Sequence, residues 1–560
     1  MSASGRLREV WRSARRRIAG DPYNRLIWAT VLRGERPRWT RARDAASSGP
    51  RVLIATSMGG FPFGALLEST LAAALTLRGS QVDMLLCDSF LPACQLTEIA
   101  GASPEVLAQS RVQPRCESCH GAGRTVFEPL GLPIHWYSNL VDEAHRREAQ
   151  RVAAAVPLED VGDYSLDGLA VGEHALAGAL RYFARGDLRG EPASEAVLRR
   201  YLEAALLSVA ALQTLLEQRQ YDVACFNHGL YVPQGLIGEV CRRAGVRVVN
   251  WNPAYRKHCF IFSHGDTYHH TMVAEPRDTW EDIAWNAQLE SATLDYLKSR
   301  WQGTQDWIWF HENPEEDINQ IAQQVGIDFS RPCIGMLTNV MWDAQLHYPS
   351  NAFAGMLDWV LQTISYFARR PELQLVIRVH PAEIRGGVPS RQPLVPEIHT
   401  AFPALPANVF VIPPDSQVST YALVEKCNAA LIYNTKTGIE VSSMGVPVVV
   451  AGEAWIRNKG FSLDASSPAE YFEILDRLPL PAGLDAAQLE RARKYAFHFF
   501  FRRMVPLPFI VSGENGRPSV QLARLEELEP GHFPGLDVIC DGILHGKPFV
   551  YPAEQLGQPE

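Results

Sequence analysis

The sequence predicts an α/β protein made of two successive doubly wound, Rossmann-like domains. Short runs rich in Val, Ile and Leu alternate with helix-like segments, first over 51–253 and again over 332–452. A polar, aromatic stretch that contains proline separates the two series at 304–332. With 560 residues, the chain is also too long for a single hydrophobic core.

The first series opens with a strand–helix–strand unit at 51–89. VLIAT is an apolar strand, and apolar residues then recur at helical spacing until Gly79, before VDMLLC begins the next strand. A long amphipathic helix is predicted over 195–219. Further strands at 221–229 and 245–253 flank another helix. Strands joined by helices run parallel, so we place an N-terminal domain at 46–303.

The second series predicts a C-terminal domain at 333–490, after a linker at 304–332. Its helices are expected over 354–370, 419–427 and 437–445. The aromatic stretch RARKYAFHFFFRRM at 491–504 predicts a late helix, and we expect residues 491–560 to pack back on the N-terminal domain. The predicted strands cover 332–340, 373–381, 408–414, 428–434 and 446–452.

Composition limits the possible partners. The formal charge of −9 argues against broad nucleic-acid binding. No apolar run approaches the roughly 20 residues needed to cross a bilayer, and the first residues do not resemble a secretory signal. A cytoplasmic location is therefore expected.

The basic N-terminal arm, residues 1–45, stands apart from the rest of the chain. Residues 1–43 contain twelve arginines and three acids, with Trp and Ile side chains between them. Such an arm can lie on an anionic membrane surface, which would make the protein peripheral at the inner membrane. The alternative is a solvated helix that packs on the body of the protein.

Two strand ends of the second domain carry polar chemistry. LQLVIRVHPAE ends a strand with Arg378, His380 and Glu383, and NTKTGIE follows the strand LIY about 55 residues later. Ligands bind beyond the carboxyl ends of parallel strands, and the first turn of a helix has backbone N–H groups without intrahelical partners. We therefore predict a phosphate site that needs no metal, with Glu383 on a sugar hydroxyl or paired with a nearby arginine.

The predicted nucleotide-binding residues surround these two strand ends. SQVSTY at 416–421 is a further candidate for contact with the base or ribose, and AWIRNKGF adds a lysine. The full set is Arg378, His380, Pro381, Glu383, Ser419, Thr420, Asn434, Thr435, Lys436, Thr437, Gly438, Glu440 and Lys459.

The same residues carry a family resemblance. VIRVHPAE, the segment from PPDSQVSTY to SSPAEY, and LTNVMWDAQLHYPSNAFAGMLDWVLQTI resemble bacterial capsule and surface-polysaccharide biosynthesis proteins related to Kdo- and sialic-acid transferases. The resemblance is clear over 330–475 and looser over 50–260. It implies the GT-B fold, in which two Rossmann-like domains face a cleft, and a CMP- or UDP-linked sugar donor held mainly by the second domain.

The resemblance also implies transfer without a catalytic metal, to a surface glycan or lipid-linked acceptor. His380 and Pro381 match a histidine–proline motif that holds the nucleotide phosphate in related sialyltransferases. A later Ser/Thr pair of those enzymes matches either Thr435 and Thr437 or the deeper Ser442 and Ser443. Retention or inversion at the sugar stays open.

An acceptor hydroxyl needs a general base. His228, which follows a strand of the first domain, is the leading candidate, with Asp343 second and His380 also in the catalytic set. Glu68 is a further alternative. The Gly59–Gly60 turn predicts close approach of a substrate to the first sheet.

Other functions stay open. A nucleotide-sugar 2-epimerase or a polyol-phosphate transferase would use the same fold, and an inactive GT-B component of capsule assembly or export would be no enzyme. Cys87, Cys94, Cys116 and Cys119 cluster in the sequence and predict structural zinc, an iron–sulfur cluster or free thiols. CESCH also spells a haem-attachment motif, but we expect no export to the compartment where haem is attached.

Overall fold

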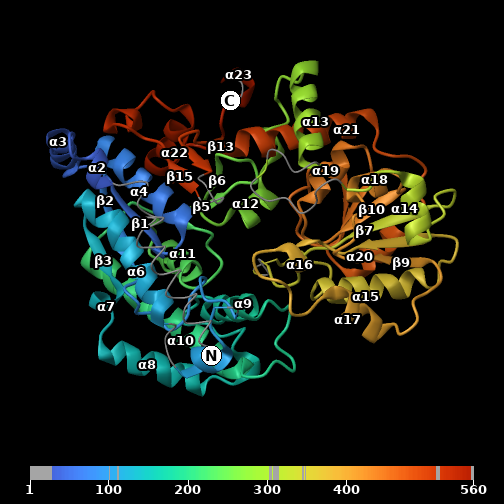
Figure 1. Ribbon diagram of the computed structural model, residues 1–560, viewed down its shortest axis with the longest axis horizontal. Coiled ribbons are helices and arrows are strands. Elements are labelled where there is room, and N and C mark those ends of the chain that lie inside the picture. Colours follow the sequence, from blue (N-terminus) through green and yellow to red (C-terminus); the bar gives the residue numbers. More distant parts are fainter. Residues whose placement is uncertain are drawn as a thin grey trace, which may run out of the picture.

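The computed structural model describes residues 28–556 apart from 100, 110–112, 302–305, 307–313, 344–345, 347 and 513–517. Two lobes lie side by side, each built around its own sheet with helices on both faces (Figure 1). The α/β fold class with two doubly wound domains is confirmed.

The first sheet has the order β13-β6-β5-β4-β1-β2-β3. Neighbours from β5 to β3 are parallel, whereas β6 and β13 are antiparallel additions at one edge. The apolar runs that predicted strands lie in the middle, where both faces are buried. The strands are β1 (Arg51–Ser57), β2 (Gln81–Leu86), β3 (Ile134–Trp136), β4 (Val223–Asn227), β5 (Arg247–Pro253), β6 (Cys259–His264) and β13 (Met504–Pro506).

Helices surround this sheet. The predicted helix over 195–219 is α10 (Ser194–Gln218), which contacts α8, α9 and α11. The others are α2 (Trp28–Val31), α3 (Arg36–Ala46), α4 (Pro62–Leu77), α5 (Pro104–Gln109), α6 (Gln113–Phe127), α7 (Tyr137–Leu140), α8 (Glu143–Ala155), α9 (Val171–Phe183), α11 (Gln234–Arg243), α12 (Tyr268–Ala274) and α13 (Ala287–Trp301).

The second sheet has the order β12-β11-β10-β7-β8-β9 and is parallel throughout. Its strands are β7 (Cys333–Leu337), β8 (Gln374–Arg378), β9 (Val409–Ile412), β10 (Ala429–Ile432), β11 (Val448–Val450) and β12 (Ser462–Asp464). Its helices are α14 (Ile318–Val325), α15 (Met356–Phe367), α16 (Ala382–Arg385), α17 (Leu394–Ala401), α18 (Thr420–Glu425), α19 (Thr437–Ser443) and α20 (Pro468–Leu475).

The last part of the chain returns to the first lobe. Helix α21 (Ala486–Phe497) leads into the π-helical segment η4 (His498–Arg503), and β13 then pairs with β6. The elements that follow are β14 (Ile510–Ser512), β15 (Pro518–Val520), α22 (Pro534–His545) and α23 (Ala553–Leu556). Helix α22 contacts β13, β4 and α4, so the tail shares the core of the first lobe.

The stretch expected to be a linker is partly folded. Its residues 304–332 include α14, whose first turn is capped by the Asp317 carboxylate and whose Ile321 is buried. Helix α14 contacts β9 and α18, so α14 belongs to the second lobe. Its polar composition reflects an amphipathic helix on the surface of that lobe.

Most of the basic arm lies outside the described residues. Where the arm is described, Trp39 Nε1 donates to the Leu130 carbonyl at 2.7 Å, and Arg43 donates to the Gly131 carbonyl at 2.6 Å. Arg38 forms an ion pair with Glu529. Residues 36–46 therefore pack on the first lobe. Within the described residues, no helix is both long enough and apolar enough to cross a membrane.

Candidate functional site

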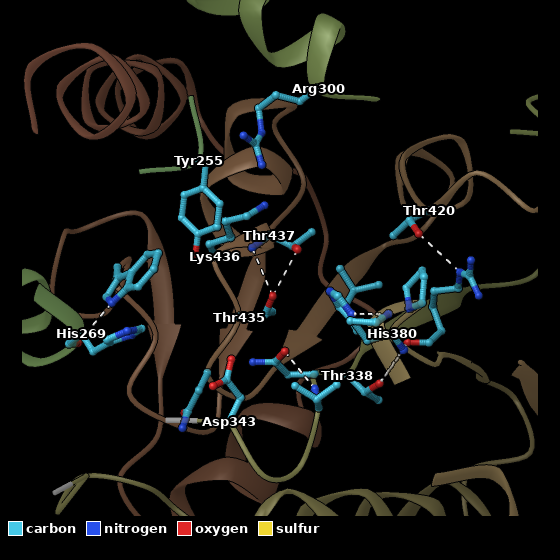
Figure 2. A pocket seen from close by; sticks show the side chains of 18 of the residues that line it. Tyr255, His269, Arg300, Thr338, Asp343, His380, Thr420, Thr435, Lys436 and Thr437 are labelled. Atoms are coloured by element: carbon cyan, nitrogen blue, oxygen red, sulfur yellow. Dashed lines mark hydrogen bonds between the residues drawn. The ribbon is translucent and has the colours of Figure 1, made fainter. Parts of the chain in front are cut away.

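A cavity of about 310 Å³ lies between the two lobes, at the carboxyl ends of the strands of the second sheet (Figure 2). Parallel α/β sheets bind ligands at this edge. The first lobe contributes Tyr255, which follows β5, His269 of α12 and Arg300 of α13. Its lining from the second lobe is Leu337, Thr338, Asn339, Val340, Asp343, Tyr348, Arg378, His380, Pro381, Ala382, Thr420, Tyr421, Asn434, Thr435, Lys436, Thr437, Glu453 and Trp455, with Asp306 between the lobes.

His380 is held in one tautomer by its own turn. Its Nδ1 accepts the Ala382 N–H at 3.1 Å, so the proton of the neutral ring is on Nε2. The His380 backbone N–H donates to Thr338 Oγ1 at 3.1 Å, which ties the ends of β8 and β7 together. His380 therefore presents a hydrogen-bond donor to the cavity, as a phosphate site requires.

Thr435 and Thr437 lie beside each other at the end of β10 (Figure 2). Thr435 Oγ1 donates to Thr437 Oγ1 at 3.2 Å and accepts the Thr437 backbone N–H at 3.3 Å. The Thr437 backbone N–H, one of the groups predicted to lack a partner at the start of α19, is thus already bonded to Thr435. The two hydroxyl groups, rather than that N–H, face the cavity as potential ligands.

Lys436 belongs to a buried network of charges under the cavity. Its Nζ lies 3.0 Å from Glu440 Oε1, and Arg300 Nε lies 2.9 Å from the same oxygen. Arg300 also pairs with Asp306, and Tyr421 donates to Glu440. Burial alone would raise the pKa of Glu440, but Lys436 and Arg300 lower it to about 2. The charge of Lys436 is therefore balanced locally.

Arg378 lines the cavity, yet its guanidinium is used by the protein. It donates to the carbonyls of Pro413 at 2.6 Å and Ser416 at 3.1 Å, and more weakly to Thr420 Oγ1. Burial lowers the pKa of Arg378 to about 10, so it stays charged at neutral pH. Its main visible role is to hold the loop after β9.

Five of the predicted nucleotide ligands lie outside the cavity lining. Glu383 is buried, where both carboxylate oxygens accept the Leu394 N–H at 3.3 Å, and burial raises its pKa to about 7. Ser419 caps α18, and Gly438 packs so closely that a Cβ would lie 2.6 Å from Ile432. Lys459 Nζ donates to the carbonyls of Val273 and Glu275 in the first lobe.

Glu440 also lies outside the lining, within the network described above. Sequence could not reveal the pairing of Glu440 with Arg300, because the two residues lie 140 positions apart. Of the predicted set, Arg378, His380, Pro381, Thr420, Asn434, Thr435, Lys436 and Thr437 do line the cavity.

Asp343 is the predicted catalytic residue that reaches the cavity from the loop after β7. In Figure 2 it lies between His269 and His380. Tyr231 of the first lobe donates to Asp343 Oδ1 at 3.1 Å. A carboxylate so placed can accept a proton from an acceptor hydroxyl.

His228 lies just behind the cavity and does not line it. Its ring is 5.3 Å from that of His269 and 5.0 Å from that of Tyr231. Burial, reinforced by Arg181 and His270, lowers the pKa of His228 to about 3, and burial and His228 lower that of His269 to about 3. Both rings are neutral near pH 7. Glu68, the other alternative, is buried in the core, bonded to Thr56 and Trp251.

Sequence reasoning missed most of the first-lobe contribution. His269 is the second residue of α12, and Tyr255 follows β5 in NWNPAY. Tyr255 lies two residues after the end of β5, and His269 lies five residues after the end of β6, so a position soon after a strand was the available signal. Thr338 and Asn339 could have been found the same way, since they directly follow β7.

The four clustered cysteines line a small apolar cavity of about 40 Å³ in the first lobe. Gly60 N–H donates to Cys119 Sγ at 3.1 Å, and burial raises the pKa of Cys87 and Cys119 to about 12. Among the described residues, no group of three or more His, Cys, Asp or Glu side chains is arranged to hold a metal ion. The geometry thus gives the zinc or iron–sulfur prediction no support.

Comparison with known proteins agrees with the resemblance found in the sequence. Residues 320–488 match the family model described as "Capsule polysaccharide biosynthesis protein", which covers the second sheet and its helices. The resemblance to this capsule family is confirmed over that range. No curated protein matches the chain.

The solved structures that match this chain include two structures of KpsC from Thermosulfurimonas dismutans. The beta Kdo 2,4 transferase is 11% identical, with a TM-score of 0.34 over 55% of this chain and 87% of that one. The beta Kdo 2,7 transferase is 10% identical, with a TM-score of 0.29 over 57% and 88%. UDP-GlcNAc 2-epimerase from Neisseria meningitidis is 11% identical, with a TM-score of 0.25 over 80% and 98%.

Proposed function

We propose that this chain is a glycosyltransferase that moves a sugar from a nucleotide-sugar donor to a surface glycan or lipid-linked acceptor. Its second lobe matches the family model of capsule polysaccharide biosynthesis, and its two sheets flank one cavity in a GT-B-like fold. The observation that carries this proposal is the meeting of His380, Thr435 and Thr437, from two strand ends, across one cavity from Asp343.

The nucleotide phosphate would lie between the His380 ring and the hydroxyls of Thr435 and Thr437. The Nε2–H of His380 and the Thr437 hydroxyl, which Thr435 orients, would donate to the oxygens of the leaving nucleotide, where negative charge grows as the glycosidic bond breaks. Because these protein donors supply the stabilisation, we expect transfer to continue in the presence of a chelator.

The acceptor would enter on the side of the first lobe. Asp343 would take the proton of its attacking hydroxyl, and Tyr231 would orient the carboxylate through their 3.1 Å hydrogen bond. His228 does not line the cavity, so Asp343 is preferred to it for this role. Sugars linked to CMP and sugars linked to UDP are both candidate donors.

Binding of free nucleotides tests the proposal. We expect CMP or UDP to raise the Tm of the full chain, and His380→Ala to weaken that nucleotide about tenfold, the effect of losing one hydrogen bond to a charged group. His399→Ala, an exposed histidine on α17 of the same lobe, is the matched control and should bind as the wild type does.

Two results would contradict the proposal. One is the absence of binding for CMP, CDP, UDP and GDP alike, and the other is equal binding by His380→Ala. Conversion of a nucleotide sugar without any acceptor would instead favour the 2-epimerase alternative.

A further inference from the structure

The loop that carries Asp343 is attached to the first lobe by a histidine of α12. His270 Nε2 lies 2.9 Å from the Leu346 carbonyl oxygen, and its Nδ1 lies 2.9 Å from Asp266 Oδ2. The His270 ring also meets the Tyr348 ring edge to face, with centroids 5.2 Å apart. Leu346 thus lies between two residues that line the cavity, Asp343 and Tyr348.

These two contacts join the lobes through one ring. A carbonyl oxygen only accepts, so His270 Nε2 donates to Leu346. The Asp266 carboxylate, whose pKa is lowered because His270 and Arg242 outweigh the effect of its burial, holds the other side of the ring.

Other contacts show that this loop takes its position from the first lobe. Tyr231 donates to Asp343, and the Leu346 side chain is buried against Ala177, Leu230 and Tyr231. The next residue of α12 toward the N-terminus, His269, accepts a hydrogen bond from Trp455 Nε1 at its carbonyl, at 3.1 Å.

We propose that His270, oriented by Asp266, is a positioning residue that fixes the loop bearing Asp343 against the first lobe. It does not line the cavity itself; it acts through the Leu346 carbonyl and the Tyr348 ring on the position of the Asp343 carboxylate. This inference deepens the proposed function, and its catalytic part rests on that function, whereas its effect on the loop does not.

The test measures amide hydrogen exchange in peptides spanning Thr338–Asp343 of the full chain. His270→Ala should speed this exchange about tenfold, the loss of one hydrogen bond. His135→Ala is the matched control, since His135 also pairs with an aspartate, Asp83 at 2.8 Å, on the edge strand β3 away from the cavity. The control should leave the loop unchanged.

The variant Asp266→Asn separates positioning by the ring from simple packing. It keeps the shape of the side chain but removes the carboxylate that holds the His270 ring, so it should also speed exchange in the loop.

Activity completes the test. With the identified nucleotide sugar, His270→Ala should lower kcat about tenfold or more while the Kd for the free nucleotide stays within twofold, because His380 and the threonines are untouched. Unchanged loop exchange in either His270→Ala or Asp266→Asn would overturn the inference. A changed loop in a protein that binds no nucleotide would leave the positioning role standing and refute only the proposed function.

Discussion

Asp343 is the residue on which the proposed chemistry depends most. Asp343→Asn keeps the hydrogen bond from Tyr231 but removes the ability to accept a proton, so we expect kcat to fall by about 10²–10⁴ with the Kd for nucleotide nearly unchanged. Steady-state transfer assays with a nucleotide sugar would measure this. Asp358→Asn on α15, which contacts Gln362 and lies outside the cavity, should retain full activity. Full activity in Asp343→Asn would move the role of base elsewhere.

Glu68 predicts a pH dependence of stability. Burial is the main cause that raises its pKa to about 8, against the bonds from Thr56 and Trp251. The unfolded chain releases this proton near pH 4.5, whereas the folded protein keeps it until about pH 8, so the free energy of unfolding falls as pH rises through that window. Glu68→Gln removes the ionisation and should show a flatter Tm between about pH 5 and 8. Parallel Tm curves for both proteins would contradict the shift.

At the scale of elements, the Gly59–Gly60 turn makes room for a helix. A Cβ on Gly59 would lie 2.4 Å from the backbone of Gly123 in α6 and 2.5 Å from the Cys119 carbonyl. The predicted role of this turn was the approach of a substrate, but α6 occupies that position. The glycine is needed because the β1–α4 turn and α6 are in backbone contact.

We therefore expect Gly59→Ala to lower the free energy of unfolding by about 1–3 kcal/mol, as overpacking against an immovable backbone does. Chemical denaturation would measure the change. Gly121→Ala, in the same helix α6 and with open space at its Cβ, should be neutral or slightly stabilising. A loss as large in Gly121→Ala would mean that helix α6 itself, not the contact, is sensitive.

Sequence predicted the elements that are apolar and long. Strands β1, β4, β7 and β8 were recognisable because both of their faces are buried and their residues are therefore continuously apolar. The three-residue strands β3 and β13 lie at opposite edges of the first sheet, and β13 follows a π-helical segment, so neither has a readable pattern.

The candidate site was predictable on one side only. His380 and Thr435–Thr437 directly follow strands of one sheet, so their convergence follows from topology. The cations Arg378, Lys436 and Lys459 were expected to meet phosphate, but each has protein partners from elsewhere in the chain. Pairing across 140 residues, as between Arg300 and Glu440, leaves no trace in local sequence.

For the whole molecule, the Arg300 network is the main charged connection under the cavity. Arg300 of α13 pairs with Asp306 and with Glu440 of α19, all nearly inaccessible to solvent. Arg300→Ala would leave these carboxylates buried with less compensation, and we expect a loss of about 3–5 kcal/mol in the free energy of unfolding. Equilibrium denaturation would measure it.

A matched ion pair sets the scale for that loss. Arg493 of α21 pairs with Glu290 of α13, but both side chains are part-exposed. Arg493→Ala should therefore cost about 1 kcal/mol or less. Equal losses in the two variants would show that the burial of the Arg300 network adds nothing.

The pairing of β13 with β6 has a consequence for how the protein is made. About 240 residues, including the entire second sheet, are synthesised between these neighbouring strands. Until the ribosome has passed Pro506, the nascent chain displays the unpaired edge of β6, which other polypeptides can join. The first sheet is therefore complete only after the carboxyl-terminal segment has been synthesised and β13 has paired with β6. Truncated chains that end before β13 should be insoluble.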